Sequence, residues 1–173
     1  MVFRCQAGDE EAFTRLFERH CGPVKYYLRR MLGSVETAED VSQGVWLNVL
    51  RGIRGLKRLG AFRTWLYTIA RREALSQLER EGRVTAADDE TDPETLPDDA
   101  GDEFSADDAE AVHAALDKLS AVHREALVLR YIEDMSYEEI AAVTGCGLGT
   151  VRSRIHYAKG ALRRLMEEAD DGR

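Results

Sequence analysis

The chain has 173 residues, of which 44% are hydrophobic and 32% charged, and its formal net charge is −8 at neutral pH. This length allows one large helical domain or two small ones. No apolar run approaches the roughly 20 residues that a membrane-spanning helix needs, and no signal-peptide pattern opens the chain, so we expect a soluble cytoplasmic protein without membrane insertion. Cys5, Cys21 and Cys146 lie far apart and form no C-x-x-C pair, which argues against a disulfide framework or a structural zinc site.

The charge is distributed unevenly. Residues 84–112 contain twelve acids and no Lys or Arg, so the rest of the chain carries 20 acids against 24 bases. The bases concentrate in residues 51–83, where nine Lys or Arg accompany three Glu. The acidic total therefore conceals two basic segments, separated by an acidic one, whose charge suits nucleic acid.

Apolar residues at helical spacing begin in residues 9–32, where Gly22-Pro23 interrupts them. Because proline fits best in the first turn of a helix, this segment predicts two core-forming helices. His20 and Cys21 would point about 100° apart on a helix, and no further ligands lie at supporting spacing. We therefore interpret both as packing or surface residues and expect no metal and no cofactor.

A third helix should begin after Gly33-Ser34. One side of it is apolar and predicted to face the core: Ala38, Val41, Val45, Val49 and Ile53. The other side carries Asp40, Gln43, Gly44, Leu47 and Arg51. An isolated exposed leucine needs no explanation. A leucine among Asp, Gln and Arg also suits contact with a partner's helix, so both interpretations of Leu47 remain open here.

A fourth helix should follow the loop 55–60. Its apolar ridge consists of Phe62, Leu66, Ala70, Ala74 and Leu78, with Trp65 and Ile69 beside it. Arg63, Tyr67 and Arg71 form a parallel row, and Arg72 lies on the flank near Trp65. Bases interleaved with aromatic rings suit single-stranded nucleic acid, although Phe62 and Trp65 could equally anchor the core beside solvated arginines. We favour the core for Phe62 and Trp65, and nucleic-acid contact for Arg63, Tyr67 and Arg71.

Residues 84–111 are acidic, contain two prolines and have little apolar content, which predicts a flexible linker. Two interpretations remain open. The linker is a solubilising spacer, or it mimics nucleic acid in a basic channel of a partner.

Helical patterning resumes at Val112 and ends in a predicted helix-turn-helix over residues 136–164. Ser136 and Glu139 form a capping box, and Gly145 and Gly147 mark the turn. In the second helix an apolar stripe contains Val151, Ile155, Ala158, Leu162 and Leu165. The opposite face contains Arg152, Ser153, His156, Tyr157, Arg163 and Arg164, with Lys159 at its edge. Since no acid lies between Leu148 and Met166, this face suits the major groove of DNA, and an ordinary helical hairpin is the alternative.

These residues resemble an extracytoplasmic-function sigma factor, a member of the sigma-70 family of bacterial RNA polymerase. Four motifs carry the resemblance: AGDEEAFTRLFERH, AEDVSQGVWLNVL, FRTWLYTIARREAL, and the stretch from LSAVHREAL to RIHYAKGAL. The resemblance implies an all-α fold with two small helical domains, sigma region 2 in residues 1–83 and sigma region 4 in residues 112–173, joined by the linker.

The resemblance also implies partners and site residues. Asp40, Gln43 and Leu47 would bind core polymerase. The minus-ten element would be held by Lys57, Arg58, Arg63, Tyr67, Arg71 and Arg72, and the minus-thirty-five element by Thr150, Arg152, Ser153, His156, Tyr157 and Lys159. An anti-sigma factor is a candidate further partner. The chain departs from the usual pattern at Gly44, where an acid is common, and at Arg72, Ser76 and Tyr157, which bears on docking and promoter sequence.

We therefore expect a promoter-specificity subunit that directs core polymerase to promoters and promotes melting. No nucleophile-base pair, metal cluster or phosphate loop is present in the sequence, so we expect no enzymatic activity. The alternatives are a stand-alone helix-turn-helix regulator of duplex operators and, from another class, a helical scaffold or an enzyme whose acids coordinate metal.

Overall fold

The computed structural model describes residues 1–83 and 109–171, and all regular secondary structure in these two ranges is helical. The chain divides into two compact units. The N-terminal unit contains α1 (Val2–Gln6), α2 (Glu10–Leu32), α3 (Val35–Gly52), η1 (Ile53–Gly55), η2 (Leu59–Ala61) and α4 (Phe62–Arg80). The C-terminal unit contains α5 (Ala109–Lys118), α6 (Ala121–Leu127), the π-turn η4 (Val128–Ile132), α7 (Tyr137–Thr144) and α8 (Leu148–Asp171).

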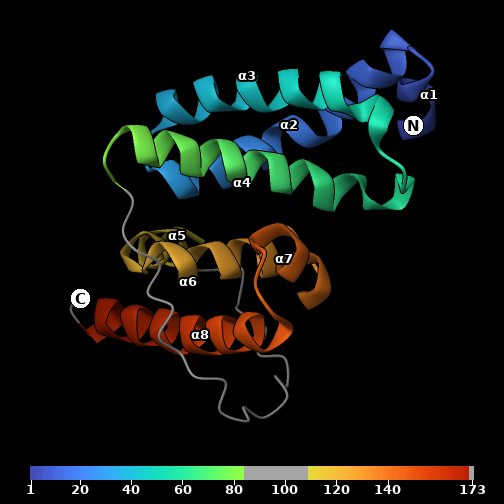
Figure 1. Cartoon of the computed structure of the whole chain (residues 1–173). Helices are drawn as coiled ribbons and strands as arrows, with labels where there is room; N and C mark the ends of the chain where they lie inside the picture. Colours follow the sequence, from blue (N-terminus) through green and yellow to red (C-terminus); the bar gives the residue numbers. More distant parts are fainter. Residues whose placement is uncertain (84–108, 172–173) are drawn as a thin grey trace. The chain divides into compact units, whose positions relative to one another are not determined.

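In the N-terminal unit, α2, α3 and α4 pack side by side around one apolar core (Figure 1). The predicted core positions of α3 and the predicted ridge of α4 are all buried. Between α2 and α4 the rings of Tyr27 and Tyr67 meet edge to face with centroids 5.3 Å apart. Periodicity thus located this core correctly, because each helix has one apolar stripe that only its neighbours can cover.

The prediction of two helices in residues 9–32 was wrong, since α2 continues through Pro23 as a single helix. Proline removes the donor that would reach the carbonyl of Arg19, but Gly22 and Pro23 are exposed, so water can solvate that carbonyl. Val24, the next residue, and Tyr27, one turn later, are fully buried and carry the packing past the proline. Tertiary packing therefore outweighs the local break.

The C-terminal unit packs α5 and α6 against α8 (Figure 1). Its core contains Ala115, Leu116, Leu119, Leu127, Ala158 and Leu162. Arg124 ties the end of α5 to α6, because its guanidinium donates to the carbonyls of Leu116 (2.9 Å), Asp117 (3.1 Å) and Leu119 (2.9 Å). The carbonyl of Leu116 also accepts from the N–H of Leu119 (3.2 Å), and the carbonyls after it lie at a helix C-terminus, where a donor from the next helix satisfies them.

The segment predicted as the linker lies largely outside the described residues. Its last residues are an exception, because α5 begins at Ala109 rather than at Val112. Alanine and glutamate favour helix. The acidic composition of the predicted linker therefore did not prevent a helix from starting at its last three residues, Ala-Glu-Ala.

Candidate functional site

The helix-turn-helix forms from local sequence signals. The capping box is complete, since the N–H of Ser136 donates to Glu139 Oε2 (2.9 Å) and the N–H of Glu139 donates to Ser136 Oγ (3.2 Å). After α7, Gly145 has a φ of +74°, a left-handed conformation that other residues adopt at a cost. The carbonyl of Gly147 then accepts the first helical bond of α8 from Val151 (3.0 Å).

On α8 the predicted apolar stripe is buried from Val151 to Leu162 and half-buried at Leu165, and part of the predicted opposite face is exposed. Arg152, His156 and Tyr157 are exposed, and Thr150 is half-buried. The rings of His156 and Tyr157 meet edge to face, with centroids 5.6 Å apart. The first three turns of α8 therefore expose the guanidinium of Arg152 and the two polar rings.

Two predicted contact residues on α8 are in fact buried. Ser153 is 1% exposed, and its hydroxyl contacts the carbonyls of Gly149 (3.0 Å) and Thr150 (3.2 Å) on its own helix. A serine that donates to the preceding turn can be buried without leaving a polar group unsatisfied. Lys159 is 8% exposed because its position, four residues after Ile155, turns it toward the packed side of the helix. Both assignments to the DNA-facing surface are corrected.

In the N-terminal unit, α3 exposes the face predicted to meet a partner. Asp40 and Gln43 are exposed, and Leu47 is 52% exposed. Sequence reasoning missed Leu50, which is 53% exposed. Its spacing of three residues from Leu47 was the available signal. Two adjacent exposed leucines on a helix whose other side is buried form a small apolar surface beside polar groups.

Gly44 lies on the flank of this face, next to a carboxylate from α4. A Cβ at Gly44 would lie 3.9 Å from Glu73 Oε2, and Glu73 Oε1 accepts from the side-chain amide of Asn48 (2.9 Å). Arg72 adds an ion pair to Glu73 Oε1 at 3.8 Å. Negative charge therefore stands beside position 44 although the residue there is glycine.

The loop after α3 carries exposed cations. Lys57 and Arg58 are exposed, and Leu59 beside them is also largely exposed. At the base of the loop the indole of Trp65 lies against Gly52, where a Cβ would come within 2.9 Å of the ring. Phe62 is buried in the core, as we favoured, whereas Trp65 is only half-buried.

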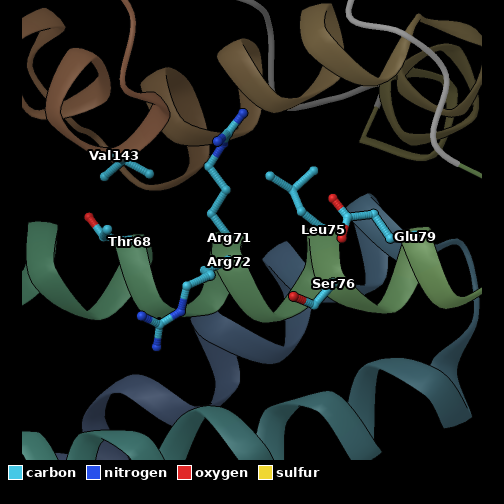
Figure 2. Close-up of a pocket in the computed structure, with 7 residues that line it drawn as sticks. All are labelled: Thr68, Arg71, Arg72, Leu75, Ser76, Glu79 and Val143. Atoms are coloured by element: carbon cyan, nitrogen blue, oxygen red, sulfur yellow. The ribbon is translucent and has the colours of Figure 1, made fainter.

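The basic row on α4 is only partly a surface. Arg63 and Arg71 are half-buried and Arg72 is exposed. Tyr67, however, is 1% exposed and packs on Tyr27, so the expectation that it contacts nucleic acid is corrected. Figure 2 shows Arg71 and Leu75 pointing to the same side of α4 and Arg72 to a different one.

His20 lies beside this row without being part of it. Its ring is 5.5 Å from that of Phe62, and burial, together with the nearby guanidinium groups of Arg19 and Arg63, lowers the pKa of its imidazole below the ordinary value. The neutral form is therefore favoured, because a charge there would be poorly hydrated and would face like charges.

Neither a metal cluster nor a membrane span is found in the described ranges. No three His, Cys, Asp or Glu side chains come together there as metal ligands. Nor does any helix in those residues have the length and apolar character that crossing a membrane requires.

Comparison with known proteins matches both units. Residues 16–84 match the family model Sigma-70 region 2, and residues 109–162 match Sigma-70, region 4. The sigma factor CarQ of Myxococcus xanthus is 36% identical over 168 residues, covering 96% of each chain. The sigma-H factor of Pseudomonas aeruginosa is 35% identical over 178 residues, covering 96% of this chain and 92% of that protein.

A solved structure shares the fold. The sigma factor RpoE of Bartonella quintana, crystallised with the anti-sigma factor NepR, superposes with a TM-score of 0.72 at 26% identity, covering 91% of this chain and 98% of that one. Family models occur in the order region 2 then region 4, and the relatives are matched along nearly their whole length, in agreement with the two helical units described above. The chain belongs to the sigma-70 family of RNA polymerase sigma factors, in its extracytoplasmic-function group.

Proposed function

We propose that this chain binds core RNA polymerase and brings it to promoters, where its two units hold separate promoter elements. The observation that carries the proposal is the composition of the N-terminal unit. That unit combines an exposed leucine surface on α3 with exposed cations at Lys57 and Arg58, so it is equipped to bind a protein and a nucleic acid at once. A regulator that binds operators alone has no use for this combination, and the match to region 2 does not favour that alternative.

We assign the site residues by whether their side chains are accessible to a partner. Asp40, Gln43 and Leu47, with Leu50 added, would dock on the polymerase. The minus-ten element would be held by Lys57, Arg58, Arg63, Arg71 and Arg72, and the minus-thirty-five element by Thr150, Arg152, His156 and Tyr157. Tyr67, Ser153 and Lys159 are omitted because they are buried.

Melting would be driven by binding. Cations neutralise phosphates, and bases freed from the duplex gain contacts that the closed duplex does not offer. Sigma factors are initiation factors that act without catalysis of their own, and we place this chain in the cytoplasm with the polymerase it would serve.

An anti-sigma factor is a further proposed partner. The RpoE structure that this chain resembles contains the anti-sigma factor NepR. The exposed leucines of α3 would be a natural surface for such an inhibitor, since covering them prevents polymerase docking.

Run-off transcription with purified bacterial core polymerase tests the proposal. A promoter is first selected from genomic fragments by the reconstituted holoenzyme and then transcribed with and without the chain. We expect a discrete transcript only when the chain is present. Tight binding of duplex DNA by the chain alone, with no transcript from any selected fragment, would instead support a stand-alone regulator.

A further inference from the structure

One side chain of α1 bonds to the base of the loop 55–60. We call this the cationic loop, because it carries Lys57 and Arg58. Gln6, the last residue of α1, donates from Nε2 to the carbonyl of Ile53 (2.9 Å) and to the carbonyl of Leu56 (2.8 Å). These carbonyls lie 47 and 50 residues further along the chain. They belong to the short segment that leads from α3 into Lys57 and Arg58.

Both carbonyls can accept a donor from outside the segment. Ile53 and Leu56 follow the end of α3, where carbonyls have no helical partner, and only Ile53 accepts a further backbone bond, from the N–H of Leu56 (3.2 Å). A glutamine amide nitrogen has two hydrogens, so one side chain can satisfy both acceptors. A carboxylate has none and would repel both.

The helix that carries Gln6 is itself held in place. Arg4 pairs with Asp9 Oδ2, with Nη2 at 2.6 Å and Nε at 2.7 Å. Asp9 Oδ1 accepts from the N–H of Ala12 (2.9 Å), and this bond and Arg4 together lower the pKa of the Asp9 carboxyl below its usual range. Asp9 is the N-cap of α2, so α1 is anchored to the longest helix of the N-terminal unit.

A second observation places the same two segments close together. Between α1 and α2, Gly8 adopts a φ of +88°, and a Cβ built on it would lie 3.9 Å from Nη2 of Arg54. The side chain of Arg54, in η1, therefore lies near this turn. The two hydrogen bonds of Gln6 are the contacts that hold the base of the loop against α1.

We propose that Gln6 is a positioning residue for promoter melting, acting through the loop that presents Lys57 and Arg58. A loop held in one conformation before DNA arrives loses less conformational entropy on binding than a loose one. Gln6 thus favours capture of the separated minus-ten strand without touching it. This inference rests on the proposed function.

The test uses the full-length chain in holoenzyme with core polymerase. Gln6→Ala removes both hydrogen bonds, and Gln6→Glu also places a carboxylate against the two carbonyls. The matched control is Gln77→Ala on α4, because Gln77 donates only to Glu81 Oε1 (2.6 Å), one turn away on the exposed surface.

Four quantities are measured: affinity for core polymerase, affinity for duplex minus-thirty-five DNA, the rate of promoter opening by permanganate footprinting, and amide hydrogen exchange of residues 56–58. For Gln6→Ala we expect roughly tenfold slower opening and faster exchange, because both hydrogen bonds to the base of the loop are lost. We expect a larger effect for Gln6→Glu. Affinities for core polymerase and for duplex DNA should equal those of the Gln77→Ala control.

Three results would overturn the proposal. Unchanged exchange would show that Gln6 does not order the loop. Faster exchange with normal opening would show that the ordering has no role in melting. An equal loss of core affinity would mean that Gln6 only stabilises the unit. If the unaltered chain opened no promoter, the proposed function and this role would both fail. The difference in amide exchange between Gln6→Ala and Gln77→Ala would still show whether Gln6 orders the loop.

Discussion

The two units build the surfaces proposed to bind nucleic acid in different ways. In the C-terminal unit, the capping box, the Gly145 turn and the exposed residues of α8 are contiguous in sequence. In the N-terminal unit, the base of the cationic loop is held by Gln6, which lies far away in the chain. The comparison teaches that a surface built from adjacent residues can be identified from spacing, whereas one assembled from distant segments requires the tertiary structure.

The largest expected effect lies on α3 and tests whether the N-terminal unit has a second, protein-binding role. Leu47→Glu should weaken binding to core polymerase by about 100-fold or more, because a charge would be placed in an apolar contact. Pull-down and fluorescence titration with core polymerase would measure this. Val35→Glu is the matched control, since Val35 is also exposed on α3 but lies three turns earlier. Equal losses for the two variants, or unchanged binding by Leu47→Glu, would remove the α3 face from the proposal.

The next effect concerns the exposed surface of α8, whose residues are close together in the sequence. Arg152→Ala should cost about 1–3 kcal/mol of discrimination at one base pair of the minus-thirty-five element if the guanidinium contacts a base edge. Competition binding across single-base variants of that element would show this. Arg164→Ala, also exposed on α8 but three turns further along, should not alter base preference. A uniform loss on all sequences would make Arg152 a phosphate contact.

A smaller effect measures how much the helix N-caps contribute to the stability of the C-terminal unit. Ser136→Ala should lower its free energy of unfolding by about 1 kcal/mol, because the N–H of Glu139 loses its acceptor. Ser120→Ala should cost less, since the bond from the N–H of His123 to Ser120 Oγ is longer, at 3.4 Å. Urea denaturation monitored by circular dichroism measures both. If Ser120→Ala cost more than Ser136→Ala, the capping box would not be the stronger signal.

The smallest effect is a pH dependence confined to the N-terminal unit. Because the pKa of His20 is lowered in the folded state, the unfolded chain binds a proton first as pH falls. The stabilising contribution is complete above about pH 6.5 and is lost as pH falls from there through the folded pKa. Thermal unfolding between about pH 7 and pH 5 should show this loss. His20→Gln should flatten the dependence, and an unchanged slope would assign it to other groups.

Sequence patterns predicted most of the fold because the helices are amphipathic. They failed at Pro23, where the buried face continues past a residue that usually begins a helix. They also failed at Tyr67, Ser153 and Lys159, which lie beside apolar stripes. A helical wheel gives the direction of a side chain but not the width of the surface that neighbouring helices cover, and these three residues fall within the covered width.

The sequence by itself determined the all-helical class, the two sigma regions and the helix-turn-helix, because these depend on local periodicity, caps and a glycine turn. Only the tertiary structure decided which polar residues are buried, that Glu73 stands beside Gly44, and that Gln6 holds the loop. The physical reason is how far apart in the sequence the interacting residues lie. A helix is specified by interactions within about four residues, whereas burial and the bonds of Gln6 join residues that the chain brings together only when it folds.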